Sequence, residues 1–270
     1  FGKLYGGYGY QPDIDGAPAE MNFAGADVYQ PQVSDVTSHH KFNLGGNVNL
    51  FHGNSRVSVI GLFNNVNQQN FSFEDILGVT GGGGGGGMGH GRGVGRYMVR
   101  PQSGVAQVAS IGMQYSNSWG ENDKIKLEGS YTFNANNNKH WSWSDRDYFL
   151  TDEEIANNPD QIYQRQISNS NSQGKGSSHS FNTRFEWRIN ERQRFMMRAN
   201  VSTSDNESNG TNANNYFPVE ADDAGILLNS WSLGESDNIN TGVNGHYMVR
   251  IGEKAGRTFQ VNFGGNYNTS

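Results

Sequence analysis

The sequence predicts an all-β fold, an antiparallel up-and-down transmembrane β-barrel with long loops at one end. Three observations predict it. Segments of about ten residues alternate apolar and polar side chains, short and long connections alternate along the chain, and no run of about 18 apolar residues could form a membrane-spanning helix. The chain has 270 residues, no Cys and a formal net charge of −6. Aromatic residues make up 12% of it, which argues against a disordered chain.

Nine strands are expected, and period-2 alternation defines most of them. In the strand at 124 to 135, one face carries apolar side chains: Ile125, Leu127, Tyr131 and Phe133. The opposite face carries Lys126, Glu128, Ser130 and Thr132. The expected strands are residues 1–9, 41–51, 56–66, 105–116, 124–135, 180–189, 194–203, 239–251 and 259–268.

Two of these strands depart from clean alternation. The strand at 105 to 116 places Gln107 on its apolar face. In the strand at 56 to 66, Ile60 and Leu62 are out of phase with Val59 and Phe63. We therefore expect either a β-bulge there or a strand that is apolar on both sides.

Charge is distributed unequally between the two faces. Over the seven strands that alternate, the apolar face has about 40 positions and none is Asp, Glu, Lys or Arg, although the chain average of 17% predicts about seven. A soluble sandwich also alternates, but its strands are commonly five or six residues long. The longer strands and the charge-free face favour contact with lipid.

The connections indicate the topology. Short polar turns are expected at 52–55, 118–122, 190–192 and 252–256, and long connections of about 30, 38, 41 and 32 residues at 11–40, 67–104, 136–176 and 205–236. This order places every short turn at one end of the sheet and every long loop at the other, as in outer-membrane barrels.

Motifs for catalysis or nucleic-acid binding are not found. The stretch GGGGGGGMGHGRGVGR at residues 81 to 96 lacks the Lys-Ser or Lys-Thr of a phosphate loop, so we interpret it as a flexible loop. A net charge of −6 disfavours nucleic acid as a partner. The His residues show no ligand spacing, and no nucleophile elbow or carboxylate pair is present, so we expect no enzyme activity and no cofactor.

Two local features receive structural interpretations. TDEEIANN at residues 151 to 158 has a capping box, Thr151 with Glu154, which predicts a short helix. Seven aromatic residues near the expected strand ends and loop bases are typical of the aromatic girdles of membrane barrels: Trp119, Trp141, Trp143, Trp187, Trp231, Tyr115 and Tyr148.

A calcium site is the one metal site the sequence suggests. Asp205, Glu207 and Asn209 alternate as at the start of a calcium loop, but the twelfth position is Tyr216 instead of Glu. Two interpretations remain open, a loose calcium site on an outer loop and a turn rich in Asn and Ser.

The polar face carries eight basic residues against Glu128 and Glu186: Lys41, Lys124, Lys126, Arg184, Arg188, Arg194, Arg198 and Arg250. If this face lines a lumen, these side chains would attract anionic solutes. Docking of an internal plug domain by salt bridges explains them equally well.

Several stretches resemble a known family. FGKLYGGYG, FNLGGNVNLFHGNSRVSVIGLFNNVNQQNFSFEDILGVTG and SGVAQVASIGMQYSNSWGENDKIKLEGSYTFNANNNK are similar to the first barrel strands of Bacteroidota outer-membrane β-barrel proteins related to TonB-dependent receptors. The likeness covers the first five strands, and the later strands agree in pattern. It implies that residues 1–270 are part of one larger barrel, with a plug and a regulatory domain upstream.

The resemblance also implies a function. We expect an outer-membrane transporter of a Gram-negative cell that takes up a bulky nutrient, a siderophore, glycan or peptide. Its partners would be outer-membrane lipid, the TonB complex reached through the plug, and a surface lipoprotein. The alternative is an outer-membrane structural or surface-binding protein whose loops bind glycans or partner proteins without transport. A soluble extracellular β-protein is a third hypothesis.

Overall fold

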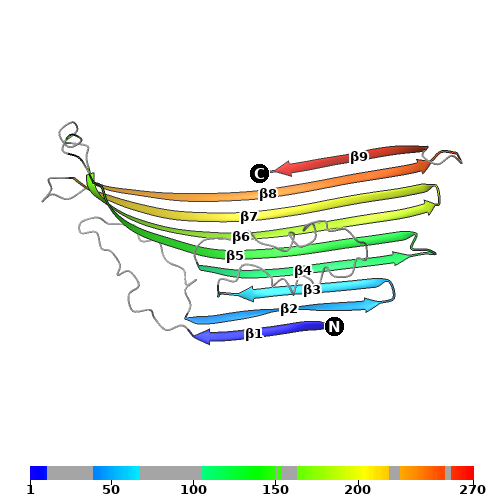
Figure 1. The fold of residues 1–270 in the computed structure, drawn as a ribbon, viewed down its shortest axis with the longest axis horizontal. Coiled ribbons are helices and arrows are strands. Elements are labelled where there is room, and N and C mark those ends of the chain that lie inside the picture. The colour runs from blue at the N-terminus through cyan, green and yellow to red at the C-terminus, as the bar shows by residue number, and fades with distance from the viewer. Residues whose placement is uncertain are drawn as a thin grey trace.

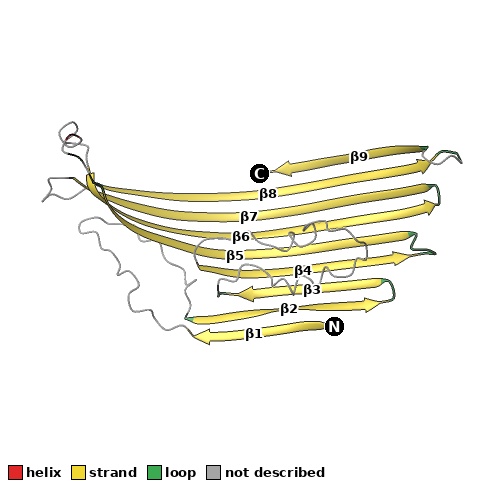
Figure 2. Ribbon diagram, viewed as in Figure 1, coloured by secondary structure: helices red, strands yellow, loops and turns green. Residues whose placement is uncertain are grey.

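The computed structural model describes residues 1–10, 39–66, 105–149, 151, 153, 163–218, 226–252 and 257–270. These residues form one nine-stranded antiparallel sheet whose strands follow one another in chain order (Figures 1 and 2). The strands are β1 (Gly2–Tyr10), β2 (His40–His52), β3 (Ser55–Asn64), β4 (Val105–Trp119), β5 (Ile125–Asp147), β6 (Tyr163–Asn190), β7 (Gln193–Pro218), β8 (Ile226–Arg250) and β9 (Thr258–Thr269).

The predicted up-and-down order is confirmed. The hairpins β2–β3, β4–β5, β6–β7 and β8–β9 all turn at the same end of the sheet, shown on the right of Figure 1. Within the described residues the sheet is open, because β1 and β9 are its two edges and do not pair with each other.

Left-handed backbone conformations produce the short turns. Gly53 has φ of 56° and Gly120 of 83°, and Asn122 and Asp123 adopt φ of 57° and 54°. Gly and Asn tolerate this region best, which explains why these residues punctuate the strands. The Asp123 carboxylate accepts hydrogen bonds from Ser118 Oγ at 2.7 Å and from Asn54 Nδ2 at 3.2 Å, so it joins two neighbouring turns.

Four strands are much longer than the sequence predicted. β5 continues to Asp147 and β6 begins at Tyr163, and β7 continues to Pro218 with β8 beginning at Ile226. The predicted connections at 136–176 and 205–236 were therefore wrong, and only residues 148–162 and 219–225 lie between these strands. The added segments are rich in Asn, Ser and Gly. They pair through their backbones without an apolar face, so alternation could not reveal them.

The register keeps the two faces separate over most of the sheet, with shifts only at the two ends of the β6–β7 pairing. β3 pairs in unbroken register with β2 over 55–64 and with β4 over 56–64, so the bulge that we considered for β3 is not formed. β3 is instead apolar on both sides. Ile60 and Leu62 lie on the otherwise polar face, where they are buried to 1% and 3% exposure. Gln107 lies on the apolar face, as predicted.

The described residues form a single layer. Extensive contacts join only strands that are neighbours in the sheet, and the buried apolar residues are few: Ile60, Leu62, Ala106, Val108 and Ala213. Most large apolar side chains stay exposed, including Phe181, Phe259 and Phe263. The described elements therefore provide no second layer that covers the apolar face.

The hairpin ends are staggered. The register connects Arg56 of β3 with Asn244 of β8. The pair next to the turn of the β2–β3 hairpin contains Ser55, one residue from Arg56. The pair next to the turn of the β8–β9 hairpin contains Arg250, six residues from Asn244. The centres of the β2–β3 and β8–β9 hairpins are six strand spacings apart, so this shift of five residues corresponds to a strand tilt of about 30° from the line of turns. Closed barrels have strand tilts of about 35–45°.

Candidate functional site

One face of the sheet carries a continuous charge-free belt, here called the apolar band. It extends from Ile125 to Ala135 on β5 and from Val249 to Ile239 on β8. The midpoint of the band on β2 lies near Gly46, which is in register with Ile239 of β8. The midpoint of the band on β8 lies five residues away, near Asn244. The band therefore follows the stagger of the turns. Its ten residue steps span about 29 Å at a 30° tilt.

Aromatic side chains line the turn end of the apolar band. One row of the register crosses β4 to β8 through Trp119, Ile125, Trp187, Phe195 and Tyr247. Trp119 and Trp187 thus lie where the sequence predicted an aromatic girdle. Trp143 and Trp231 do not, because they lie on strand segments far beyond the opposite limit of the band.

Aromatic packing crosses the strands within the band. Phe195 stacks on Phe263 with ring centroids 6.4 Å apart, and Phe185 lies 6.3 Å from Phe195. The Phe263 ring occupies the space above Gly245, where an added Cβ would overlap the ring. A glycine on one strand and a ring on the next therefore produce a flat apolar surface.

A row of charges ends the apolar band on the side away from the turns. Lys175, Glu207 and Glu235 stand opposite one another on β6, β7 and β8, and Asp205 faces Asp237 one pleat nearer the band. We call these five residues the ionic row. They lie on the same face as the band, so the change from apolar to charged occurs along single strands.

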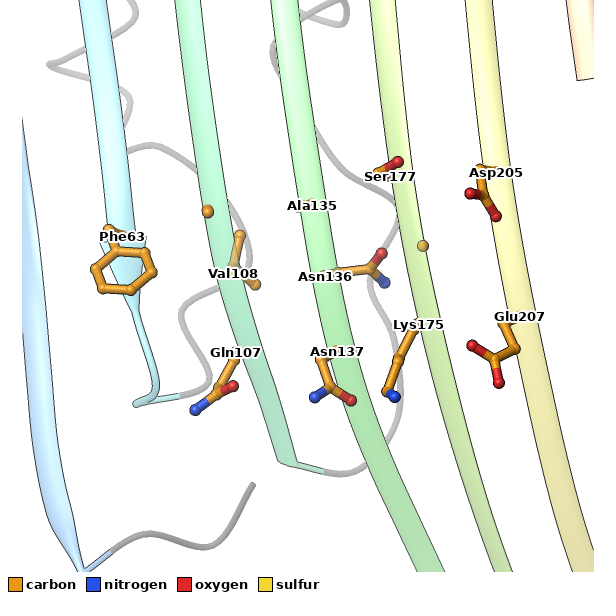
Figure 3. A pocket seen from close by; sticks show the side chains of 12 residues that line it. Phe63, Gln107, Val108, Ala135, Asn136, Asn137, Lys175, Ser177, Asp205 and Glu207 are labelled. Atoms are coloured by element: carbon orange, nitrogen blue, oxygen red, sulfur yellow. The ribbon is translucent and has the colours of Figure 1, made fainter. Parts of the chain in front are cut away.

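A hollow of about 370 Å³ lies where the apolar band meets the ionic row (Figure 3). Phe63, Ala109 and Ala135 contribute its apolar lining. A row of polar side chains, Gln107, Asn137, Lys175 and Glu207, crosses four strands beside it, as Figure 3 shows. The hollow is therefore amphipathic.

The opposite face is polar, and its charges concentrate near the turns. Arg184 faces Arg198, and Arg188 faces Arg194, on β6 and β7. In the register of β5 and β6, Lys126 stands opposite Glu186 and Glu128 stands opposite Arg184. Arg184 forms an ion pair with Glu186. These residues, with Arg250 at the end of β8, form the basic zone.

Six of the eight predicted basic residues therefore lie together at the turn end of the polar face. Lys124 precedes β5 in the turn, where its Nζ is 3.9 Å from a Glu121 carboxylate oxygen. Lys41 lies near the opposite end of β2, paired with Gly9, and does not join the group. The prediction of one basic surface holds for the turn end only, because β2 brings Lys41 to the other end of the sheet.

On β5 to β8, the polar face next to the basic zone continues as a long stretch of uncharged side chains. From Ser130 to Ser144 on β5, and at the facing positions of β6, β7 and β8, the side chains are almost all Asn, Ser, Thr or Gly. We call this surface the neutral zone. Asn side chains lie over the glycines of neighbouring strands, with Asn200 and Asn266 Oδ1 at 2.6 and 2.7 Å from where a Gly242 Cβ would be. Sequence reasoning missed this zone because we assigned most of it to loops.

The three residues of the suggested calcium site do not lie in a loop. Asp205, Glu207 and Asn209 lie at alternate positions of β7, an extended strand, instead of in a loop. In the part of the chain that the structure describes, no three His, Cys, Asp or Glu side chains gather to hold a metal ion. The glycine stretch at 81–96 lies outside the described residues, as does most of the helix predicted at 151–158.

A bidentate ion pair ties the far ends of β5 and β6. Arg165 donates from Nε and Nη2 to the two Asp145 carboxylate oxygens at 2.8 and 2.5 Å. The hydrogen bonds and positive charge of Arg165 hold the pKa of Asp145 below its ordinary value, and the carboxylate raises the pKa of Arg165. The pair is solvent-exposed, so its effect is local.

No protein-family model matches the chain, and no curated protein does. Among the described residues, no helix has the length and apolar character needed to span a membrane.

Proposed function

We propose that the chain is part of the wall of an outer-membrane β-barrel, and that this wall belongs to a TonB-dependent-receptor-like transporter for a bulky nutrient. The apolar band is the observation that carries the proposal. Its side chains are exposed or half-buried and carry no charge, and the band is about 29 Å high and parallel to the line of short turns. A hydrocarbon layer is about 30 Å thick, so the band has the height that lipid would cover.

The polar face supports the lumen side of the proposal. Outer-membrane barrels alternate apolar-out and polar-in, with short turns on the periplasmic side. In this orientation the basic zone lies at the periplasmic end of the lumen and the neutral zone lies toward the exterior. A hydrated wall of amides and hydroxyls would allow polar solutes to pass, and the basic zone would interact with acidic groups inside the lumen.

The membrane part is tested by flotation. The full chain is refolded in detergent, transferred to phosphatidylcholine vesicles and centrifuged through a density gradient. We expect it to float with the vesicles and to remain bound in high salt and in alkaline carbonate. A chain that stays monomeric and dispersed in buffer without detergent would support the soluble alternative instead.

The transport part needs cells that carry the natural gene. Uptake of three fluorescent probes, a ferric catecholate siderophore, a neutral maltooligosaccharide and a tetrapeptide, is measured with and without an uncoupler of the proton gradient. Transport predicts gene-dependent uptake of at least one probe that the uncoupler abolishes. Gene-dependent binding that the uncoupler leaves unchanged would favour the non-transporting surface protein.

A further inference from the structure

The ends of β5 to β8 beyond the ionic row carry exposed aromatic residues on the same face as the apolar band. Trp231 on β8 is 77% exposed and Trp143 on β5 is 47% exposed. Leu233, next to Trp231 on this face, is 61% exposed. Large apolar groups that stay exposed in this way commonly mark an interaction surface.

Amide and hydroxyl side chains lie between the two tryptophans. Trp143 is in register with Asn169 of β6, and Trp231 is in register with Thr211 of β7 and Asn171 of β6. With strands about 4.8 Å apart, the tryptophans are separated by about 16 Å. We call these five residues the tryptophan platform. The Asp145–Arg165 pair lies one pleat beyond it.

This combination suits a saccharide. The indole ring is a flat apolar surface on which the C–H face of a sugar ring can stack, and amides and hydroxyls can exchange hydrogen bonds with sugar hydroxyls. The platform itself carries no charge. The ionic row beside it contains four carboxylates against one lysine, which disfavours direct recognition of an anionic group.

The height of the tryptophan platform above the apolar band indicates which kind of saccharide can reach it. Trp231 lies eight residues beyond Ile239, the limit of the band on β8, which is roughly 23 Å above it at a 30° tilt. The head-group layer of a phospholipid leaflet is only about 5–8 Å thick, so it reaches the ionic row but not the platform. A head group built of several sugar rings is tall enough.

We propose that the tryptophan platform binds the oligosaccharide head group of outer-leaflet glycolipids. The inference rests on the proposed membrane function, because it takes the face of the apolar band as the lipid-facing side. Along that face the order would be hydrocarbon against the apolar band, charged head groups against the ionic row, and sugars against the platform. The occupant is a lipid that surrounds the barrel, not a solute that crosses it.

The test uses the full chain in phosphatidylcholine vesicles that contain either lipopolysaccharide with its core oligosaccharide or lipid A without it, at one magnesium concentration. Flotation is measured first. Acrylamide quenching of Trp231 is then obtained as the difference between the wild type and Trp231→Phe. We expect quenching to be several-fold weaker with the core oligosaccharide than with lipid A alone.

Two variants provide controls. Trp187→Phe, in the turn-end girdle, should keep the full difference between the two lipids. Asn171→Asp adds a negative charge to the platform without removing a ring, and it should reduce the protection of Trp231 while flotation stays normal.

Three results would overturn the inference. Equal quenching of Trp231 on both kinds of vesicle, in a chain that floats, would refute it and leave the membrane proposal intact. Equal protection by free core oligosaccharide at the same concentration would show a site for soluble glycans instead. A chain that does not float refutes both proposals, so the two failures are distinguishable.

Discussion

The strands β5 to β8 have two halves that fold as one sheet but differ in chemistry. The turn-proximal half has one apolar face, the band, and a polar face with the basic zone. In the distal half, one face is the uncharged neutral zone, and the other face carries the ionic row and the tryptophan platform. The register does not change between the halves, so backbone pairing continues where the apolar contribution stops. The two halves therefore differ in side-chain chemistry and not in backbone pairing.

The difference shows what each half contributes. If the apolar band faces lipid, as we propose, its side chains stabilise the turn-proximal half through burial in the membrane. Cross-strand packing such as that of Phe263 on Gly245 adds to this stabilisation. In the distal half, the fold relies on backbone hydrogen bonds and on exposed polar pairs, which contribute little each. Substitutions should therefore affect the two halves unequally.

The largest effect is expected at mid-band on β8. Val243→Arg places a charge on the lipid face and should lower the free energy of unfolding from vesicles by about 2–4 kcal/mol. Asn240→Arg is three residues away on the polar face and should change it by less than about 1 kcal/mol. Urea titrations in phosphatidylcholine vesicles compare the two. Equal losses would contradict a lipid-facing side.

Packing inside the band gives the next effect. Gly245→Ala would place a methyl group into the Phe263 ring, so we expect a loss of about 1–3 kcal/mol. Gly265→Ala on the same face meets no atom within 4 Å and should be nearly neutral. The same titrations report both. If Gly265→Ala costs as much as Gly245→Ala, the ring does not occupy the space above Gly245.

The basic zone should respond to charge reversal. Arg198 faces Arg184, and like charges directly opposite each other destabilise a sheet. We expect Arg198→Glu to stabilise the chain by about 0.2–1 kcal/mol at low salt, with a smaller gain in 1 M salt. Lys41→Glu, far from the zone, serves as the control. A gain that does not depend on salt would show another cause.

The smallest effect is local to the distal half. Because Arg165 lowers the pKa of Asp145, the pair's stabilisation is complete above the ordinary aspartate pKa and is lost as pH falls through the lowered pKa. Carboxyl NMR titration should give Asp145 a pKa below its ordinary value, and Arg165→Gln should restore that value. Unfolding free energy should stay unchanged, since the pair is exposed. An unshifted Asp145 in the wild type would show that the pair does not form.

The parts of the fold that could be predicted from the sequence are those in which apolar and polar side chains alternate with the two-residue period of a strand. Phe133, Phe185 and Phe263 stand out because they alternate with polar neighbours such as Thr132, Arg184 and Asn262. The short turns are marked by Gly53, Gly120 and Asn122. The basic zone was predictable for the same reason, as Arg184 and Arg198 alternate with apolar neighbours.

The remaining features depend on pairing between strands, which local pattern does not contain. The stretch SNSNSQGKG at 168–176 has the composition of a loop, yet residues 163–180 form a strand because β5 and β7 lie on either side. The stagger, the ionic row and the alignment of Trp231 with Thr211 and Asn171 arise from the register alone. Ile60 and Leu62 looked irregular because burial on the polar face of β3 is a tertiary effect.

The central claim is that lipid covers one face of the turn-proximal half and water covers everything else. The chain has no Cys, so single cysteines can be introduced along β8 and labelled with nitroxides without removing a native thiol. The labelled chains are then studied in vesicles. We predict that labels at odd positions from 239 to 249 are accessible to oxygen, that even positions are accessible to a water-soluble nickel complex, and that positions 231 to 237 are accessible to nickel on both faces. Nickel accessibility at the odd positions between 239 and 249 equal to that at the even ones would contradict the account.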